Sequence, residues 1–143
     1  MPTIKAFRMD GLGNKFIIVD RRKDIVNITK EKIIHLGNLE SFHREIGFDQ
    51  IIFIEREIDK TFPITIFNSD GGEVNACGNG SRCVAYLLGK DLNTKEVKLK
   101  TNNRLLNAKI ESLNLALLIL FKFNSSNDFS LRQSISSKAL PEY

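Results

Sequence analysis

The sequence predicts an α+β domain, and three observations lead to this class. Short runs rich in β-branched and aromatic residues predict strands, two stretches with helical spacing predict helices, and the connecting segments are short. The chain has 143 residues, 42% of them hydrophobic, which is enough for a single core. A strand-rich chain with two helices and no visible internal repeat is typical of an α+β domain.

The N-terminal part of the chain is predicted to contain two strands and one helix. The strands cover 4–8 and 16–20 and flank a glycine-containing turn at 10–14. Thr29 is the expected N-cap of a helix over 30–43, where apolar residues recur at helical spacing. We therefore expect a pair of strands followed by a helix.

The middle of the chain is predicted to form two more strands, a turn and a second helix. The strands 51–55 and 64–67 are short and rich in β-branched and aromatic residues, and the turn 68–72 is dense in Asn, Ser, Asp and Gly. The second helix is predicted over 78–88, with Gly89 as the residue just past its C-terminal end.

The remaining residues are predicted to form three strands and a tail. The strands are expected at 96–101, 105–111 and 115–123. Beyond them, six serines between residues 124 and 138 accompany little apolar material and no clear period. The sequence therefore predicts one folded unit over 1–123 and a loose serine-rich tail over 124–143.

Charge and hydropathy exclude several classes of protein. The 21 Lys and Arg and the 17 Asp and Glu give a net charge of +4, and the two signs are interspersed, so no nucleic-acid partner is expected. The longest apolar run, 115–121, is far shorter than the roughly 18 residues of a membrane-spanning helix. The N-terminal segment lacks the pattern of a secretory signal. We therefore expect a cytoplasmic protein with no membrane partner.

The two cysteines, Cys77 and Cys83, are expected to be free thiols. They lie six positions apart on one predicted helix, where their Cβ atoms are too distant for a disulfide. The chain has only two histidines, so a four-ligand zinc site is not expected. The run Gly11-Leu-Gly13 lacks the third glycine of a dinucleotide fingerprint, and Phe16 stands in its place. We predict neither a metal nor a cofactor.

The segment 77–80, Cys-Gly-Asn-Gly directly before a predicted helix, is the strongest candidate for chemistry. The unpaired N–H groups and the macrodipole of a helix N-terminus stabilise negative charge, so the pKa of Cys77 is expected to be lowered. The same N–H groups could hold a carboxylate. Alternatively, Cys77 is a small apolar filler at a common kind of turn. Cys83, inside the helix among apolar residues, is expected to belong to the core.

Other polar side chains are weaker candidates. Gln50 opens a predicted strand and could bind a ligand or face water. Asn68 leads a turn, where asparagine most often caps its own backbone. His35 and His43 lie in the first predicted helix and are expected to pack or to be solvated.

Four motifs in sequence order resemble the diaminopimelate epimerase family, whose members are amino-acid epimerases that work without pyridoxal phosphate. The motifs are residues 7–16 with 19–20, residues 46–50, residues 66–74 and residues 76–83. The resemblance is strong over about residues 4–83 and extends to about residue 111.

The resemblance implies two similar lobes, each a curved, mostly antiparallel sheet wrapped around a central helix, with the active site between them. Residues 1–123 would form the N-terminal lobe, with 78–88 as its central helix. Cys77 would be one of two acid/base cysteines that interconvert LL- and meso-diaminopimelate in lysine and peptidoglycan biosynthesis. The resemblance assigns substrate binding to three amide side chains and to the backbone of the first helical turn: Asn14, Gln50, Asn68, Gly78 and Asn79.

The chain departs from the family at three positions and in length. The family usually has glycine or another small residue near the position of Arg104. The family usually has histidine where this chain has Asp10, and aspartate where it has Lys15. Members are nearly twice as long, and their second lobe supplies the other cysteine and a glutamate–arginine pair.

Inversion of a stereocentre needs a base on one face of the carbon and an acid on the other. Six helical residues separate Cys77 from Cys83 by about 9 Å and about 240°, so these two thiols cannot flank one small substrate. The isolated chain is therefore expected to be inactive or to need a second lobe.

Three explanations remain open for a chain with one of the two thiols. It could work with a separately encoded second lobe, or with a homodimer mate whose Cys77 faces its own. It could be a non-catalytic remnant of the enzyme. It could also be another amino-acid racemase or isomerase of the same fold.

Overall fold

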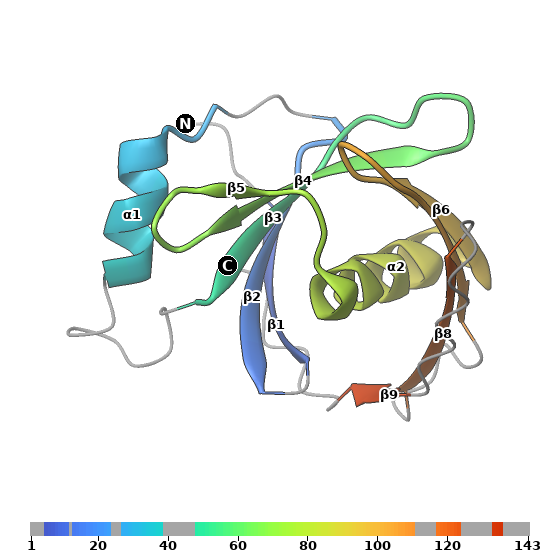
Figure 1. Ribbon diagram of the computed structural model, residues 1–143. Coiled ribbons are helices and arrows are strands. Elements are labelled where there is room, and N and C mark those ends of the chain that lie inside the picture. Colours follow the sequence, from blue (N-terminus) through green and yellow to red (C-terminus); the bar gives the residue numbers. More distant parts are fainter. Residues whose placement is uncertain are drawn as a thin grey trace.

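The fold was derived from a computed structural model of the chain (Figure 1). The structure describes residues 5–11, 13–23, 27–38, 48–110, 117–123 and 133–135. Among these residues lie two helices, α1 (Lys30–Asn38) and α2 (Gly78–Leu92). The strands are β1 (Lys5–Gly11), β2 (Asn14–Asp20), β3 (Gln50–Ile54), β4 (Phe62–Asn68), β5 (Glu73–Val74), β6 (Glu96–Lys100), β7 (Leu105–Ile110), β8 (Leu117–Phe123) and β9 (Gln133–Ile135).

The strands form one mixed sheet that curves around α2 (Figure 1). Their order is β1-β2-β3-β4-β6-β7-β8-β9, and β5 pairs with β4 beside this path. Only the β2–β3 and β4–β6 pairs are parallel, while the other pairs are antiparallel. The prediction of an α+β fold with a curved, mostly antiparallel sheet around a central helix is therefore confirmed.

Helix α2 is buried around its circumference because the sheet covers most of its surface. Its buried residues run from Gly80 through Tyr86 without a break and continue at Leu88 and Gly89. Such an all-round burial pattern is typical of a core helix rather than of an amphipathic surface helix. The inner faces of the strands supply the matching apolar side chains, among them Phe16, Ile52 and Leu99, each 0% exposed.

Helix α1 lies on the outer face of the sheet (Figure 1). Ile33 is 1% exposed and belongs to a second apolar cluster with Val19, Ile51 and Phe53, which point away from α2. Strand β3 is thus buried on both faces, which explains why it reads as an uninterrupted apolar run.

The prediction that α2 ends at residue 88, followed by Gly89, is wrong. The helix continues to Leu92, and its left-handed C-cap is Asn93, with a φ of 50°. Gly89 lies inside the helix, and a Cβ atom at this position would come within 2.0 Å of Cδ1 of Ile110. This glycine is required by the close approach of β7 and not by a turn.

One further expectation differs from the structure, and another lies outside the described residues. The predicted loose tail over 124–143 contains strand β9, which pairs with β8. The rest of that tail lies outside the described residues, so the boundary at residue 123 stays a prediction. Residues 39–47, which include His43 and the predicted end of the first helix, also lie outside them. Within the described part of the chain, no helix is long and apolar enough to cross a membrane.

Candidate active site

Cys77 is the N-cap of α2, as its position before the predicted helix suggested. Its backbone is extended (φ −146°, ψ 109°), and its Sγ atom accepts a hydrogen bond from the backbone N–H of Gly80 at 3.3 Å. Its carbonyl oxygen accepts the N–H of Ser81 at 2.9 Å, which starts the helical ladder. The thiol is partly buried and lies over the first turn of the helix.

The pKa of the Cys77 thiol is raised, so the predicted lowering is wrong. Burial is the largest cause, because it penalises the charged thiolate. The backbone N–H groups of Gly80 and Asn79 and the positive charge of Arg82 oppose it, but they are outweighed. At neutral pH Cys77 is therefore a protonated thiol whose surroundings already contain groups that stabilise the thiolate.

The first turn of α2 presents an open backbone beside the thiol. Gly78 is exposed, and a Cβ atom there would meet nothing within 4 Å. Asn79 is half-buried, and its Oδ1 atom accepts a hydrogen bond from Nη1 of Arg82 at 3.0 Å. Arg82 is only 2% exposed, so it fixes this turn from inside the protein. The N-terminal end of a helix can hold an anion.

Gly80 and Cys83 face the core. A Cβ atom on Gly80 would come within 2.4 Å of Cδ1 of Ile52 and within 3.3 Å of Cε1 of Phe16. Cys83 is 0% exposed, which confirms the prediction that it is a core residue. Its Sγ atom is 3.4 Å from the position that a Cβ on Gly11 would occupy. The turn between β1 and β2 therefore lies against the first turns of α2.

Gln50 and Asn68 form a direct pair at the edge of the sheet. They are opposite each other in the β3–β4 ladder, and Nε2 of Gln50 donates a hydrogen bond to Oδ1 of Asn68 at 3.0 Å. The remaining oxygen of Gln50, Oε1, is buried and has no hydrogen-bond partner among the described residues. Asn68 also closes the β4–β5 turn, since its N–H donates to the carbonyl of Gly72 at 2.8 Å.

The sheet places Asn14 at the same edge and on the same face. Asn14 opens β2, and β2 runs parallel to β3, which begins with Gln50. Side chains two residues apart on a strand share a face. Asn14 therefore shares a face with Phe16, and Gln50 shares one with Ile52. Because Phe16 and Ile52 are the sheet side chains nearest to Gly80, this face of the sheet is the one that covers the first turn of α2.

Two of the departures from the family pattern lie opposite each other. Asp10 and Lys15 are partners in the β1–β2 ladder, and the ladder continues to Gly11 and Asn14 without a break. By resemblance, the family has histidine and aspartate at these two positions. The hairpin that carries Asn14 is thus formed, and Gly13 supplies its positive φ of 85°.

Sequence reasoning missed Arg82 as a functional candidate. The available sign was its position three residues after Asn79, a spacing at which helical side chains meet. It also missed Asp49, which precedes Gln50 and forms the hydrogen bonds described below.

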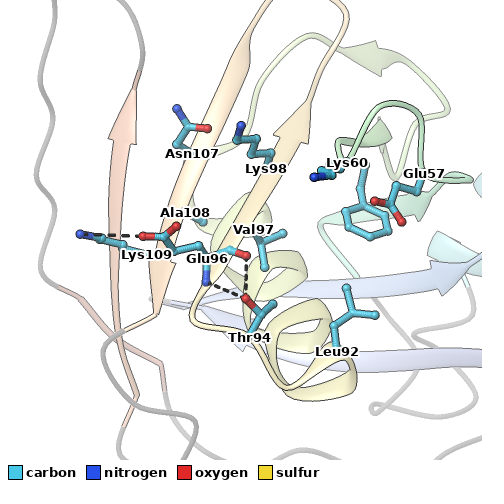
Figure 2. Close-up of a pocket in the computed structure, with 11 residues that line it drawn as sticks. Glu57, Lys60, Leu92, Thr94, Glu96, Val97, Lys98, Asn107, Ala108 and Lys109 are labelled. Atoms are coloured by element: carbon cyan, nitrogen blue, oxygen red, sulfur yellow. Dashed lines mark hydrogen bonds and ion pairs between the residues drawn. The ribbon is translucent and has the colours of Figure 1, made fainter.

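The large pockets of the described surface lie away from these residues. A pocket of about 760 Å³ lies at the C-terminal end of α2, where Leu92, Val97 and Lys60 contribute to its wall (Figure 2). An exposed ion pair of Lys109 with Glu96, at 4.0 Å, flanks it. None of the predicted site residues lines it. Within the described ranges no group of three His, Cys, Asp or Glu side chains could hold a metal ion.

Comparison with solved structures supports the fold. A predicted epimerase from Pseudomonas aeruginosa superimposes with a TM-score of 0.62 at 15% identity, over 83% of this chain and 42% of that one. A phenazine biosynthesis protein of the PhzF family from Bacillus anthracis gives a TM-score of 0.58 at 21% identity, over 86% of this chain and 40% of that one. At these identities the likeness concerns the fold alone.

Comparison of sequences identifies the family. Residues 6–120 match the family described as diaminopimelate epimerase. A diaminopimelate epimerase from Pelagibacter ubique is 46% identical over 112 residues, which are 78% of this chain and 39% of that enzyme. One from Chromobacterium violaceum is 46% identical over 84 residues, 57% of this chain and 29% of that enzyme. The chain thus spans well under half the length of these relatives, and it belongs to the diaminopimelate epimerase family.

Proposed function

We propose that this chain supplies one lobe and one acid/base thiol, Cys77, to a diaminopimelate epimerase site that interconverts the LL and meso forms. One observation carries the proposal. The Cys77 thiol and the open first turn of α2 lie under the same sheet face that presents Asn14, Gln50 and Asn68. A proton donor, an anion cradle and amide hydrogen-bonding groups thus converge at one end of the fold.

The first turn of α2 is proposed to bind the substrate α-carboxylate. Gly78 and Asn79 supply backbone N–H groups at the positive end of the helix dipole, and the absence of a side chain at Gly78 leaves room for the ligand. The amides of Asn14, Gln50 and Asn68 are proposed to bind the polar groups of the amino acid. The buried Oε1 of Gln50 is an acceptor suited to an ammonium group.

Cys77 is proposed to exchange a proton with the substrate α-carbon. Its raised pKa keeps the S–H proton in place at neutral pH, so that the thiol can donate to one face of a developing carbanion. The thiolate left behind is stabilised by the Gly80 N–H and by Arg82. In the reverse direction the same thiolate removes the proton.

The second proton-transfer thiol is proposed to come from outside these 143 residues, because the only other cysteine, Cys83, is 0% exposed in the core. A second lobe on another chain or on a longer form of this one would supply it, and a homodimer mate is the alternative partner. This requirement is a geometric one, since inversion needs groups on both faces of the carbon.

The proposal is tested by complementation in D₂O. The full chain is mixed with the part of the Pelagibacter ubique relative that the match does not cover, and loss of the α-proton signal of diaminopimelate is followed by NMR. We expect exchange in the mixture and not with either component alone. Absence of exchange in a mixture that forms a complex and binds diaminopimelate would contradict the proposal. Calorimetric titration of the chain alone separates a binding lobe from a non-catalytic remnant, because a remnant shows no saturable binding.

A further inference from the structure

Asp49 joins three segments at the edge of the sheet where the amide side chains lie. Its Oδ2 atom accepts a hydrogen bond from the backbone N–H of Lys15 at 2.7 Å. Its own N–H donates to the carbonyl of Lys15 at 2.8 Å, and its carbonyl accepts the N–H of Ser69 at 3.1 Å. One exposed residue therefore connects the start of β2, the start of β3 and the end of β4.

Each of these bonds adjoins a residue proposed to bind substrate. Lys15 follows Asn14, Asp49 precedes Gln50, and Ser69 follows Asn68 in the chain. In the sheet, Gln50 pairs with Phe16 of β2 on one side and with Asn68 of β4 on the other, and these are the end pairs of the two ladders. Asp49 extends the pairing by one residue on both sides of β3. The relative position of the three amides therefore depends on hydrogen bonds that Asp49 makes.

Substitution of Asp49 by alanine removes the hydrogen bond of its carboxylate and leaves its two backbone hydrogen bonds available. A hydrogen bond from a backbone N–H to an ionised carboxylate is shorter and about twice as strong as a neutral one. At 2.7 Å the bond to Lys15 has that character. This hydrogen bond ties the Asn14 hairpin to the start of β3, while Gln50 and Asn68 are joined by their own bond.

We propose that Asp49 is a positioning residue, whose carboxylate sets the distance between the Asn14 amide and the Gln50–Asn68 pair. Asp49 acts through Lys15 and does not itself touch substrate. The binding of substrate by these amide side chains rests on the proposed function above. Their relative position, which Asp49 is proposed to set, is a property of the folded chain.

The test compares Asp49→Ala, Asp49→Asn and Asp70→Ala in the full chain by ¹⁵N NMR. Asp70 is the matched control, because it is also exposed and its Oδ1 accepts a backbone N–H, from Gly72, at 2.7 Å, without contacting β2. We expect Asp49→Ala to shift the Lys15 backbone amide and the Asn14 side-chain NH₂ resonances. Asp49→Asn, whose amide oxygen can still accept the bond, should restore both toward their wild-type positions. Asp70→Ala should leave both unchanged.

Titration with diaminopimelate supplies the second readout. Asp49→Ala should bind about tenfold more weakly than wild type, a factor that corresponds to loss of one charge-assisted hydrogen bond. Asp49→Asn should recover most of that factor at an unchanged melting temperature. If the wild-type chain binds no diaminopimelate, the proposed function loses its support while the NMR comparison still decides the positioning. If the Asn14 and Lys15 signals are the same in Asp49→Ala and wild type, the inference is overturned whatever the binding result.

Discussion

Gly80→Ala tests how tightly the first turn of α2 is held against the sheet. The added Cβ would lie 2.4 Å from Cδ1 of Ile52, which is 0% exposed in the core. It would also lie 3.3 Å from the Sγ atom of Cys77. Overpacking of this kind costs about 1–3 kcal/mol. Alanine favours the helix over glycine by at most about 1 kcal/mol, which offsets only part of that cost.

Gly78→Ala is the matched control, because it makes the same change two residues earlier in the same turn, where a Cβ meets nothing within 4 Å. The helix-propensity gain is shared, so the difference in unfolding free energy between the two variants reports the packing term. Urea unfolding followed by circular dichroism should place the Gly80→Ala midpoint about 1 M below that of Gly78→Ala. Ile52→Val, which removes Cδ1, should relieve part of the loss in the double variant. Equal midpoints for the two alanine variants would refute the packing argument.

Three further expectations concern the thiol and the strained turn. Burial raises the pKa of Cys77, so the rate at which an alkylating reagent modifies it should still be rising at pH 8. The rate should reach no plateau below the ordinary cysteine pKa of about 8.5. A plateau near pH 7 would contradict the burial argument. The same shift makes folding stability fall as pH rises above the ordinary cysteine pKa, since the unfolded chain then loses a proton that the native chain keeps. Cys77→Ser should therefore reduce this slope in pH-dependent unfolding. Lys60 has a φ of 60° in a two-residue turn, so its replacement by glycine should stabilise the protein by about 0.5–1 kcal/mol. Lys60→Ala is its control, and an unchanged melting temperature for Lys60→Gly would show that the turn carries no strain.

The order and type of most elements could be predicted from the sequence because local patterns determine them. The run 51–54 is apolar throughout, and the structure shows it as β3, buried on both faces. Cys77 could be placed at a helix N-terminus because glycines precede an apolar helical period. The curvature of the sheet around α2, however, came from the family resemblance and not from any periodicity.

The features that were missed depend on residues far apart in the chain. Gly89 looked like a helix end, but its role is set by Ile110, which lies 21 positions later on β7. The direction of the Cys77 pKa shift was mispredicted because the helix terminus is visible in the sequence while the burial imposed by the sheet is not. Asp49 became visible only once the parallel register of β2 and β3 brought Lys15 within hydrogen-bond distance.

The central claim is that Cys77, and no other thiol of this chain, exchanges the substrate α-proton. Serine is a good N-cap, so Cys77→Ser should keep the hydrogen bond from Gly80 and the fold while removing the acidic S–H group. In the complemented mixture in D₂O, we predict that Cys77→Ser abolishes α-proton exchange on diaminopimelate and that Cys83→Ala, a change in the buried core, retains it in whatever fraction stays folded. Exchange at the wild-type rate with Cys77→Ser would contradict the account.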